Sequence, residues 1–188
     1  VQILGVAMRN AMSIVLLMLL APLAGAEVTD SAANGFTTVN EVIIADGRAE
    51  SWIAAVDQID QWWSSDHTVS GDASRLSIEP ETQGCFCETL GGKAGVVHLV
   101  VTMVNSTHLI RMTGGLGPLG LMGVDGNMTW EFEDIEGGTR VSFTYAVGGY
   151  RKDGLDKIAP AVDSVIGEAL GRLKAYVESG NPETAPVE

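Results

Sequence analysis

The order of secondary structure that the sequence predicts limits the folds available to this chain. One strand and two short helices precede a series of strands, and a single long helix follows them. Residues 155–177 carry apolar side chains at steps of three and four, the pattern of a helix with one apolar face. Because residues 75–147 are predicted to form strands, only a sheet offers a large apolar surface to that face. We therefore expect an α+β fold in which a curved antiparallel sheet wraps around the last helix and leaves a cavity.

Local patterns place the individual elements. A β-branched stretch predicts the first strand at residues 36–44, and short helices are expected at 49–56 and 59–63. A loop rich in Ser, Asp and Gly follows at 64–74. Further strands, separated by turn signals, are expected at 75–79, 85–90, 96–104, 109–113, 128–133 and 140–147, which makes about seven strands in all. The last two alternate cleanly, with Trp130 and Tyr145 on the apolar face, where we expect both to contact ligand.

The first 26 residues have the features of a secretory signal peptide. Arg9 supplies a positive charge, residues 14–20 form an apolar run, and Ala24-Gly25-Ala26 offers small residues to a signal peptidase. The run is shorter than the roughly 20 apolar residues that span a bilayer, so cleavage is expected rather than anchoring. We thus predict a periplasmic or secreted protein. Its expected parts are a signal peptide at 1–26, a flexible segment at 27–35, one domain at 36–179 and a disordered tail at 180–188.

Charge narrows the class of partner. The chain has a formal net charge of −13 at pH 7, and such a surface repels phosphate backbones and anionic lipid. Nucleic acid and bilayer surfaces are therefore not expected as main partners. The glycines of residues 114–123 lack the Gly-Lys-Ser/Thr ending of a phosphate-binding loop. We expect no cofactor, no metal centre and no membrane-spanning segment in the mature chain.

Several short motifs, taken with this order of elements, resemble a known superfamily. They are Trp62-Trp63 and residues 67–73, 84–88, 117–119 and 148–150. These residues resemble an exported bacterial branch of the START-like superfamily, also called SRPBCC, which includes birch-pollen-allergen-like and polyketide cyclase-like proteins. The resemblance covers about residues 36–178.

The resemblance implies a helix-grip fold with a deep, mostly apolar cavity between the sheet and the last helix. It also implies that the protein binds a lipid, sterol, polyketide or other hydrophobic small molecule, with catalysis in only some branches. No catalytic motif comes with it, and one fold can support many activities.

The end of the second short helix and the loop after it carry three candidate ligand-binding residues. Adjacent Trp62 and Trp63 cannot both face one way on a helix, so one is expected in the core and the other against ligand or loop, although simple packing is an alternative. His67 in the loop could bind ligand or act as a general acid or base. The alternative is that the Asp, Ser and His side chains of this loop only hydrogen-bond its own backbone.

Glu88 and His98 lie on consecutive predicted strands, and their geometry depends on the turn between them. If both face the cavity, they provide a titratable spot in apolar surroundings, suited to orienting a ligand or transferring a proton. If both face outward, they are an ordinary cross-strand pair. Either arrangement is open at this stage.

Cys85 and Cys87 alternate along one strand, so both thiols should point to the same face. In an extended strand their Cα atoms would lie about 6.5–7 Å apart, at the long edge of disulfide geometry. Three interpretations are open: buried inert thiols, a labile redox pair, or soft metal ligands with His98 as third donor.

Residues 114–123 form an apolar, glycine-rich segment between strands, which is typical of a lid, a ligand gate or a protein-docking loop. We expect a lid over the cavity, with Leu119 and Met122 in contact with ligand; a fixed capping loop is the alternative. Gly167 and Gly171 on the last helix indicate either close approach to the sheet or room for a ligand.

Two functions are consistent with the sequence. The first is an exported binding protein that holds a hydrophobic small molecule in its cavity. The second is an enzyme of cyclase, isomerase or hydrolase type that uses the same cavity, with Glu88, His98 or His67 as acid or base. No complete catalytic constellation is present in the sequence, which favours the first.

Overall fold

The structure of the protein is a computed structural model that describes residues 27–185. The predicted signal peptide at 1–26 and residues 186–188 of the predicted tail lie outside the described residues.

Eight antiparallel strands form one sheet in the order β1-β2-β8-β7-β6-β5-β4-β3. Their bounds are β1 Glu27–Ala32, β2 Gly35–Ile44, β3 Leu76–Ile78, β4 Cys85–Gly91, β5 Ala94–Asn105, β6 Leu109–Thr113, β7 Val124–Ile135 and β8 Gly138–Gly149. The predicted strands are all present, and β1 is an addition to them.

Strand β1 corrects the prediction of a flexible segment at 27–35. It pairs with β2 through a tight hairpin in which Ala32 lies opposite Gly35. Its described side chains are mostly exposed and polar, so no apolar alternation marks it in the sequence. Backbone hydrogen bonds to β2 hold this edge strand in place, and Val28 packs partly buried against the core.

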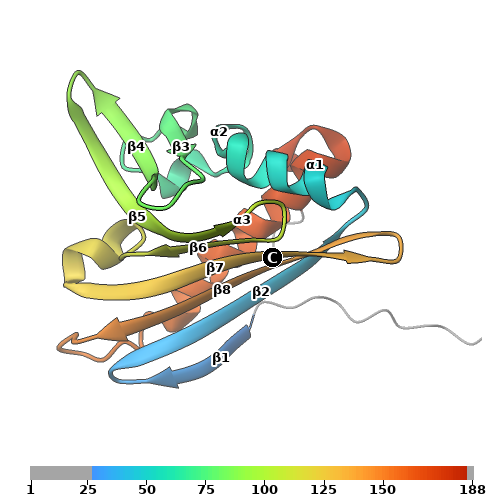
Figure 1. Ribbon diagram of the computed structural model, residues 1–188. Coiled ribbons are helices and arrows are strands. Elements are labelled where there is room, and N and C mark those ends of the chain that lie inside the picture. Colours follow the sequence, from blue (N-terminus) through green and yellow to red (C-terminus); the bar gives the residue numbers. More distant parts are fainter. Residues whose placement is uncertain (1–26, 186–188) are drawn as a thin grey trace, which may run out of the picture.

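Helix α3, Ala159–Ser179, packs against the sheet, with its closest strand contacts to β2. Figure 1 shows the sheet curving around it. Pro160 stands in its first turn, and the helix ends at Gly180, whose φ of 74° suits a glycine. Leu155 belongs to the turn before the helix and is nonetheless fully buried. The buried apolar face of α3 consists of Ala159, Ile166, Ala169, Leu170 and Leu173.

The two predicted short helices are also present. Helix α1, Arg48–Trp52, continues into a wider π-helical turn, η1 Ile53–Asp57, and α2 follows at Ile59–Trp62. They pack beside α3 and close one end of the sheet (Figure 1).

Four 3-10 turns complete the described chain: η2 Ser65–His67, η3 Ala73–Arg75, η4 Gly117–Met122 and η5 Pro182–Thr184. The last of these corrects the predicted disordered tail over its described part. The Asn181 side chain accepts a hydrogen bond from the Glu183 amide, and Glu183 pairs with Arg172 of α3 at 2.6 Å. These polar contacts order the turn without any apolar pattern in its sequence.

Large side chains occupy the space between the sheet and α3. Trp130 stacks on Phe143 with ring centroids 4.2 Å apart, and Trp62 packs against Trp130 at 6.2 Å. The largest fully buried side chains are Trp62, Trp130, Tyr145, Phe86, Phe143, Ile44, Ile59, Leu99, Ile110, Met112, Met128 and Leu155. The superfamily resemblance implies a deep cavity in this region. In the structure, closely packed apolar and aromatic side chains occupy it.

Candidate functional site

Glu88 and His98 meet inside the molecule. His98 Nε2 lies 3.0 Å from Glu88 Oε2, and the two side chains are 4% and 0% exposed. Between β4 and β5 the register shifts, because Phe86 lies opposite Leu99 but Cys87 lies opposite Val97. His98 is the extra residue of this β-bulge, which turns its side chain to the interior beside Glu88. The interior alternative for this pair is therefore the one that occurs.

Glu88 also holds the loop that follows α2. Its Oε2 accepts a hydrogen bond from the Val69 amide at 2.9 Å, and its Oε1 accepts one from the Ser70 amide at 2.5 Å. Burial is the largest influence on the pKa of Glu88 and would raise it, but the hydrogen bonds from Ser70, Val69 and His98 together lower it. The carboxylate is consequently charged, and both of its oxygens already accept hydrogen bonds.

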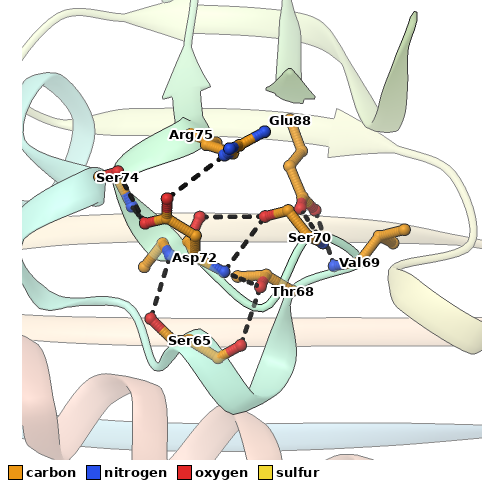
Figure 2. Close-up of polar contacts among 9 residues, drawn as sticks. Ser65, Thr68, Val69, Ser70, Asp72, Ser74, Arg75 and Glu88 are labelled. Carbon is orange, nitrogen blue, oxygen red and sulfur yellow. Dashed lines mark hydrogen bonds and ion pairs between the residues drawn. The ribbon is translucent and has the colours of Figure 1, made fainter. Parts of the chain in front are cut away.

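The loop itself is stabilised by its own side chains, as Figure 2 shows. Asp72 accepts from both the amide and the hydroxyl of Ser74, at 3.1 and 2.7 Å. The Thr68 hydroxyl donates to the Ser65 carbonyl at 2.8 Å and accepts from the Asp72 amide at 3.0 Å. This network matches the structural alternative for the loop, in which polar residues hydrogen-bond the local backbone.

His67 lies outside the interior. Its Nε2 is 3.0 Å from Glu168 Oε2 of α3, and both side chains are partly exposed. It therefore ties the loop to the outer side of α3 and does not join Glu88 and His98.

Both tryptophans at the end of α2 are buried. Trp62 Nε1 donates to the Ala54 carbonyl at 2.9 Å, whereas Trp63 Nε1 donates to the His67 carbonyl at 3.2 Å. Trp63 packs edge-on against Phe86, which in turn packs against the His98 ring, each pair with centroids 5.4 Å apart. Trp62 thus belongs to the core, and Trp63 connects the loop with the Glu88–His98 pair.

Three polar atoms on the interior face of the sheet have no hydrogen-bond partner: Thr38 Oγ1, Asn40 Oδ1 and Trp130 Nε1. All three residues are buried. Thr38 and Asn40 are adjacent on one face of β2, Asn40 lies opposite Phe143 of β8, and Phe143 lies opposite Trp130 of β7. Unsatisfied groups of this kind cost about 1–3 kcal/mol each.

Asp163 of α3 adds a fourth polar group to this region. It accepts a hydrogen bond from Asn40 Nδ2 at 3.0 Å, which leaves the Asn40 Oδ1 atom free to accept one. We refer to Thr38, Asn40, Trp130 and Asp163 as the interior polar cluster. Of these four residues, only Trp130 was predicted from the sequence to bind ligand. The sequence signal for Thr38 and Asn40 was that two polar side chains alternate along a strand that is rich in Val and Ile.

Tyr145 fastens the 114–123 segment to the sheet. Its hydroxyl donates to the Gly114 carbonyl at 2.7 Å and accepts from the Leu116 amide at 3.0 Å. Burial raises the pKa of Tyr145 to about 12, so the phenol stays protonated at neutral pH. Because Tyr145 lies opposite Thr38 in the sheet, this contact adjoins the interior polar cluster.

The 114–123 segment is partly buried and partly exposed. Leu119 of η4 is buried against the core, whereas Leu121 is 93% exposed and Met122 is 39% exposed. Leu119 therefore closes this end of the interior, and Leu121 presents an apolar side chain on the surface.

Cys85 and Cys87 form a disulfide. Their Cα atoms are 5.4 Å apart, closer than the about 6.5–7 Å expected for an extended strand. The interpretations as inert free thiols and as metal ligands are therefore wrong for this structure, and a redox pair remains. Within the described residues, no group of three or more His, Cys, Asp or Glu side chains is arranged to hold a metal ion.

Gly167 and Gly171 line a surface depression of about 920 Å³ between α3 and β2, whose lining also includes the buried residues Asn40 and Leu170. A Cβ atom on Gly171 would meet only Ala185 Cβ, at 4.0 Å, so Gly171 does not permit a close approach to the sheet. The rim is polar and includes Glu168, Arg172 and Lys174. Of the two alternatives for these glycines, the open space is the one observed, and it borders Asn40 of the interior polar cluster. No helix among residues 27–185 is long and apolar enough to cross a membrane.

A single long helix held by a curved antiparallel sheet, with a polar spot inside an apolar interior, defines a helix-grip protein. Residues 36–178 match the model of the family described as polyketide cyclase / dehydrase and lipid transport. The chain belongs to this family, within the SRPBCC superfamily that the motifs resemble.

Solved structures show the same fold at low sequence identity. The conserved protein of unknown function EF2215 from Enterococcus faecalis aligns with a TM-score of 0.60 and 14% identity, over 87% of this chain and 82% of its own. CalU16 from Micromonospora echinospora aligns at 0.52 and 13%, over 86% of each chain. DynU16, a putative protein in the dynemicin biosynthetic locus, aligns at 0.57 and 17%, over 78% of this chain and 48% of its own. The comparison with curated proteins found no match.

Proposed function

We propose that this protein binds one hydrophobic small molecule, of lipid, sterol or polyketide type, between its sheet and α3. The observation that carries the proposal is the interior polar cluster, where three buried atoms lack hydrogen-bond partners in a mainly apolar interior. A ligand that supplied matching polar groups would recover the free energy that these atoms cost in the free protein. Membership of a family described by lipid transport and polyketide cyclisation supports the same class of ligand.

The cluster specifies what the polar end of the ligand should contain. Trp130 Nε1 can only donate a hydrogen bond, Asn40 Oδ1 can only accept one, and the Thr38 hydroxyl can do either. A ligand with a carbonyl or ether oxygen near a hydroxyl group, attached to an apolar body, would satisfy all three.

Flexible side chains next to the cluster would make room for the apolar body. Met128 and Met112 are fully buried and occupy the same cross-sheet row as Thr38 and Tyr145. Methionine is unbranched and readily changes its packing.

We further propose that the 114–123 segment is the gate, because withdrawal of Leu119 and loss of the two Tyr145 hydrogen bonds would open this end of the interior.

Titration of delipidated protein with fluorescent fatty-acid and sterol probes tests this function. We expect saturable one-to-one binding, and stabilisation by about 2.7 kcal/mol when free ligand is at a hundred times its Kd. A Leu119→Ala variant should change the rate of probe uptake, while Leu121→Ala, on the exposed side of the same segment, should not. Native mass spectrometry should first show that the protein is ligand-free. The proposal would be contradicted if no probe then binds.

An enzyme of cyclase, isomerase or hydrolase type is a second candidate, favoured by the buried carboxylate and imidazole of Glu88 and His98. Proton transfer by Glu88 would first require Val69 and Ser70 to release its oxygens, since both are engaged. The His67 side chain pairs with Glu168 of α3 instead, and is not supported as a partner of Glu88 or His98.

We also propose export of the protein after removal of residues 1–26. The support is the charge, apolar run and small residues of that segment. Amino-terminal sequencing of the periplasmic fraction should begin at Glu27, and an uncleaved species confined to the cytosol would contradict export.

A further inference from the structure

The Cys85–Cys87 disulfide lies on the outer face of the sheet. The residues that alternate with the cysteines, Phe86 and Glu88, are buried in the interior, whereas both cysteines are partly exposed. The bond joins positions two apart in one strand, so it connects no separate elements of the fold. A disulfide stabilises chiefly by closing a loop in the unfolded chain, and the effect is smallest for the shortest loops. Holding the fold together is therefore a weak explanation for this bond.

Two exposed apolar side chains of β5 flank the disulfide. Val100 of β5 lies directly opposite Cys85, and Val97 lies opposite Cys87. The two valines are 38% and 60% exposed. On the other side of β4, Ser77 of β3 lies opposite Cys87. The two valines next to an accessible disulfide form a surface on which another protein can bury area while it reaches the sulfur atoms.

Glu79 distinguishes the two sulfur atoms. Its Oε2 lies 4.0 Å from Cys85 Sγ. In thiol–disulfide exchange, negative charge is carried mainly by the attacking and the leaving sulfur, and a thiol that is harder to ionise leaves more slowly. A thiolate on Cys85 would be repelled by the Glu79 carboxylate, so Cys87 is the better leaving group and Cys85 the sulfur that is attacked.

We infer that Cys85 and Cys87, with Val97 and Val100, form a thiol–disulfide exchange site for a protein dithiol. A thiolate of the partner attacks Cys85 Sγ, the Cys85–Cys87 bond breaks, and its electron pair leaves on Cys87 Sγ, which takes a proton. The second thiolate of the partner then attacks the partner's own sulfur in the mixed disulfide and displaces Cys85 as a thiolate, which is protonated in turn. The partner ends oxidised to a disulfide, and this protein ends reduced by two electrons. This inference does not depend on the proposed ligand function.

Reduction kinetics test the site with two probes, reduced thioredoxin as a protein dithiol and dithiothreitol as a small one. Intact mass after alkylation with iodoacetamide measures the reduced fraction. In a Val97→Ser, Val100→Ser variant we expect reduction by thioredoxin to slow about tenfold, because the apolar contact is lost, with the dithiothreitol rate unchanged. Met103→Ser is the matched control: Met103 is an exposed apolar residue of β5 whose neighbour in β6 is Arg111, and its loss should affect neither rate.

Three outcomes would each overturn the inference. In the double variant, reduction by the two probes could slow equally, or reduction by neither could slow. Thioredoxin could also fail to reduce a disulfide that dithiothreitol reduces. Thioredoxin that lacks its resolving cysteine should trap a mixed disulfide on Cys85, identified by peptide mass spectrometry. A trap found only on Cys87 would overturn the assignment of the attacked sulfur. Circular dichroism of each variant checks that the fold is intact.

Discussion

His98 Nε2 lies 3.0 Å from Glu88 Oε2, with both side chains almost completely removed from solvent. The same carboxylate accepts hydrogen bonds from the Val69 and Ser70 amides. A single buried charge therefore joins the sheet to the loop after α2. Such a charge is tolerated only because it is paired and fully hydrogen-bonded. The position of the loop is therefore sensitive to any change in this side chain.

Replacing Glu88 with Gln should lower the free energy of unfolding by about 3 kcal/mol, because one partner of a buried pair loses its charge. An amide nitrogen would also face a backbone N–H donor where a carboxylate oxygen now accepts. Urea denaturation measures the change. Glu133→Gln is the control, since Glu133 pairs with Arg140 in an exposed position and should cost under about 1 kcal/mol. Equal, small effects of both substitutions would contradict a structural role for Glu88.

Stability should fall at acid pH, partly through Glu88. The pKa of Glu88 in the folded protein is below its usual value of 4.5, so its contribution is present above about pH 4.5 and is lost as the pH falls through the folded-state pKa. The stability difference between the wild type and Glu88→Gln should therefore narrow as the pH is lowered. Thermal melts of both proteins from neutral to acid pH measure this difference, and a constant difference would argue against an ionised Glu88.

Tyr145→Phe should loosen the 114–123 segment, because it removes a hydrogen bond to the Gly114 carbonyl and leaves the Leu116 amide without its acceptor. The expected loss of stability is about 1–2 kcal/mol. Limited proteolysis should cut the segment faster and apolar probes should enter faster. Tyr150→Phe, at a mostly exposed tyrosine, should change neither. A segment equally resistant in both variants would remove it as a gate.

Thr38→Val should raise stability and weaken ligand binding together. The substitution keeps the shape of the side chain but removes a buried hydroxyl that has no partner in the free protein. If the ligand satisfies this hydroxyl, its Kd should rise by about tenfold, equivalent to 1.4 kcal/mol. Thermal melts and probe titration measure the two effects, with Thr144→Val, at an alternate and only partly buried position of β8, as control. Unchanged affinity would exclude Thr38 from the site.

Leu170→Asp should prevent folding, since it would place an unpaired charge on the buried face of α3 at a cost of several kcal/mol. Leu121→Asp, at an almost fully exposed leucine, should be tolerated. Circular dichroism melting compares the two variants. A Leu170→Asp protein that melts like the parent would mean that α3 does not pack against the sheet as described.

Periodic patterns of apolar residues were enough to predict the helix-grip architecture. The steps of three and four along α3 and the alternation in β7 and β8 reflect burial on one face, which a sequence records directly. The motifs around Trp62, His67 and Glu88 identified the superfamily, which the family match confirms. Strand β1 and turn η5 were missed because backbone pairing and a few polar contacts hold them, and neither leaves an apolar period.

Tertiary structure alone decided how the candidate site is arranged. One extra residue in β5 turned His98 inward to Glu88, and a shift of one residue reverses the face of a side chain without any mark in the sequence. Cys85 and Cys87 also lie within disulfide distance, with Cα atoms 5.4 Å apart. The apolar positions and the period at which they recur can be read directly from the amino-acid sequence. Strand register and loop contacts between residues far apart in the chain decided which polar groups meet in the interior and which lack partners. Hydrogen bonds require specific distances, and composition and spacing do not encode those distances.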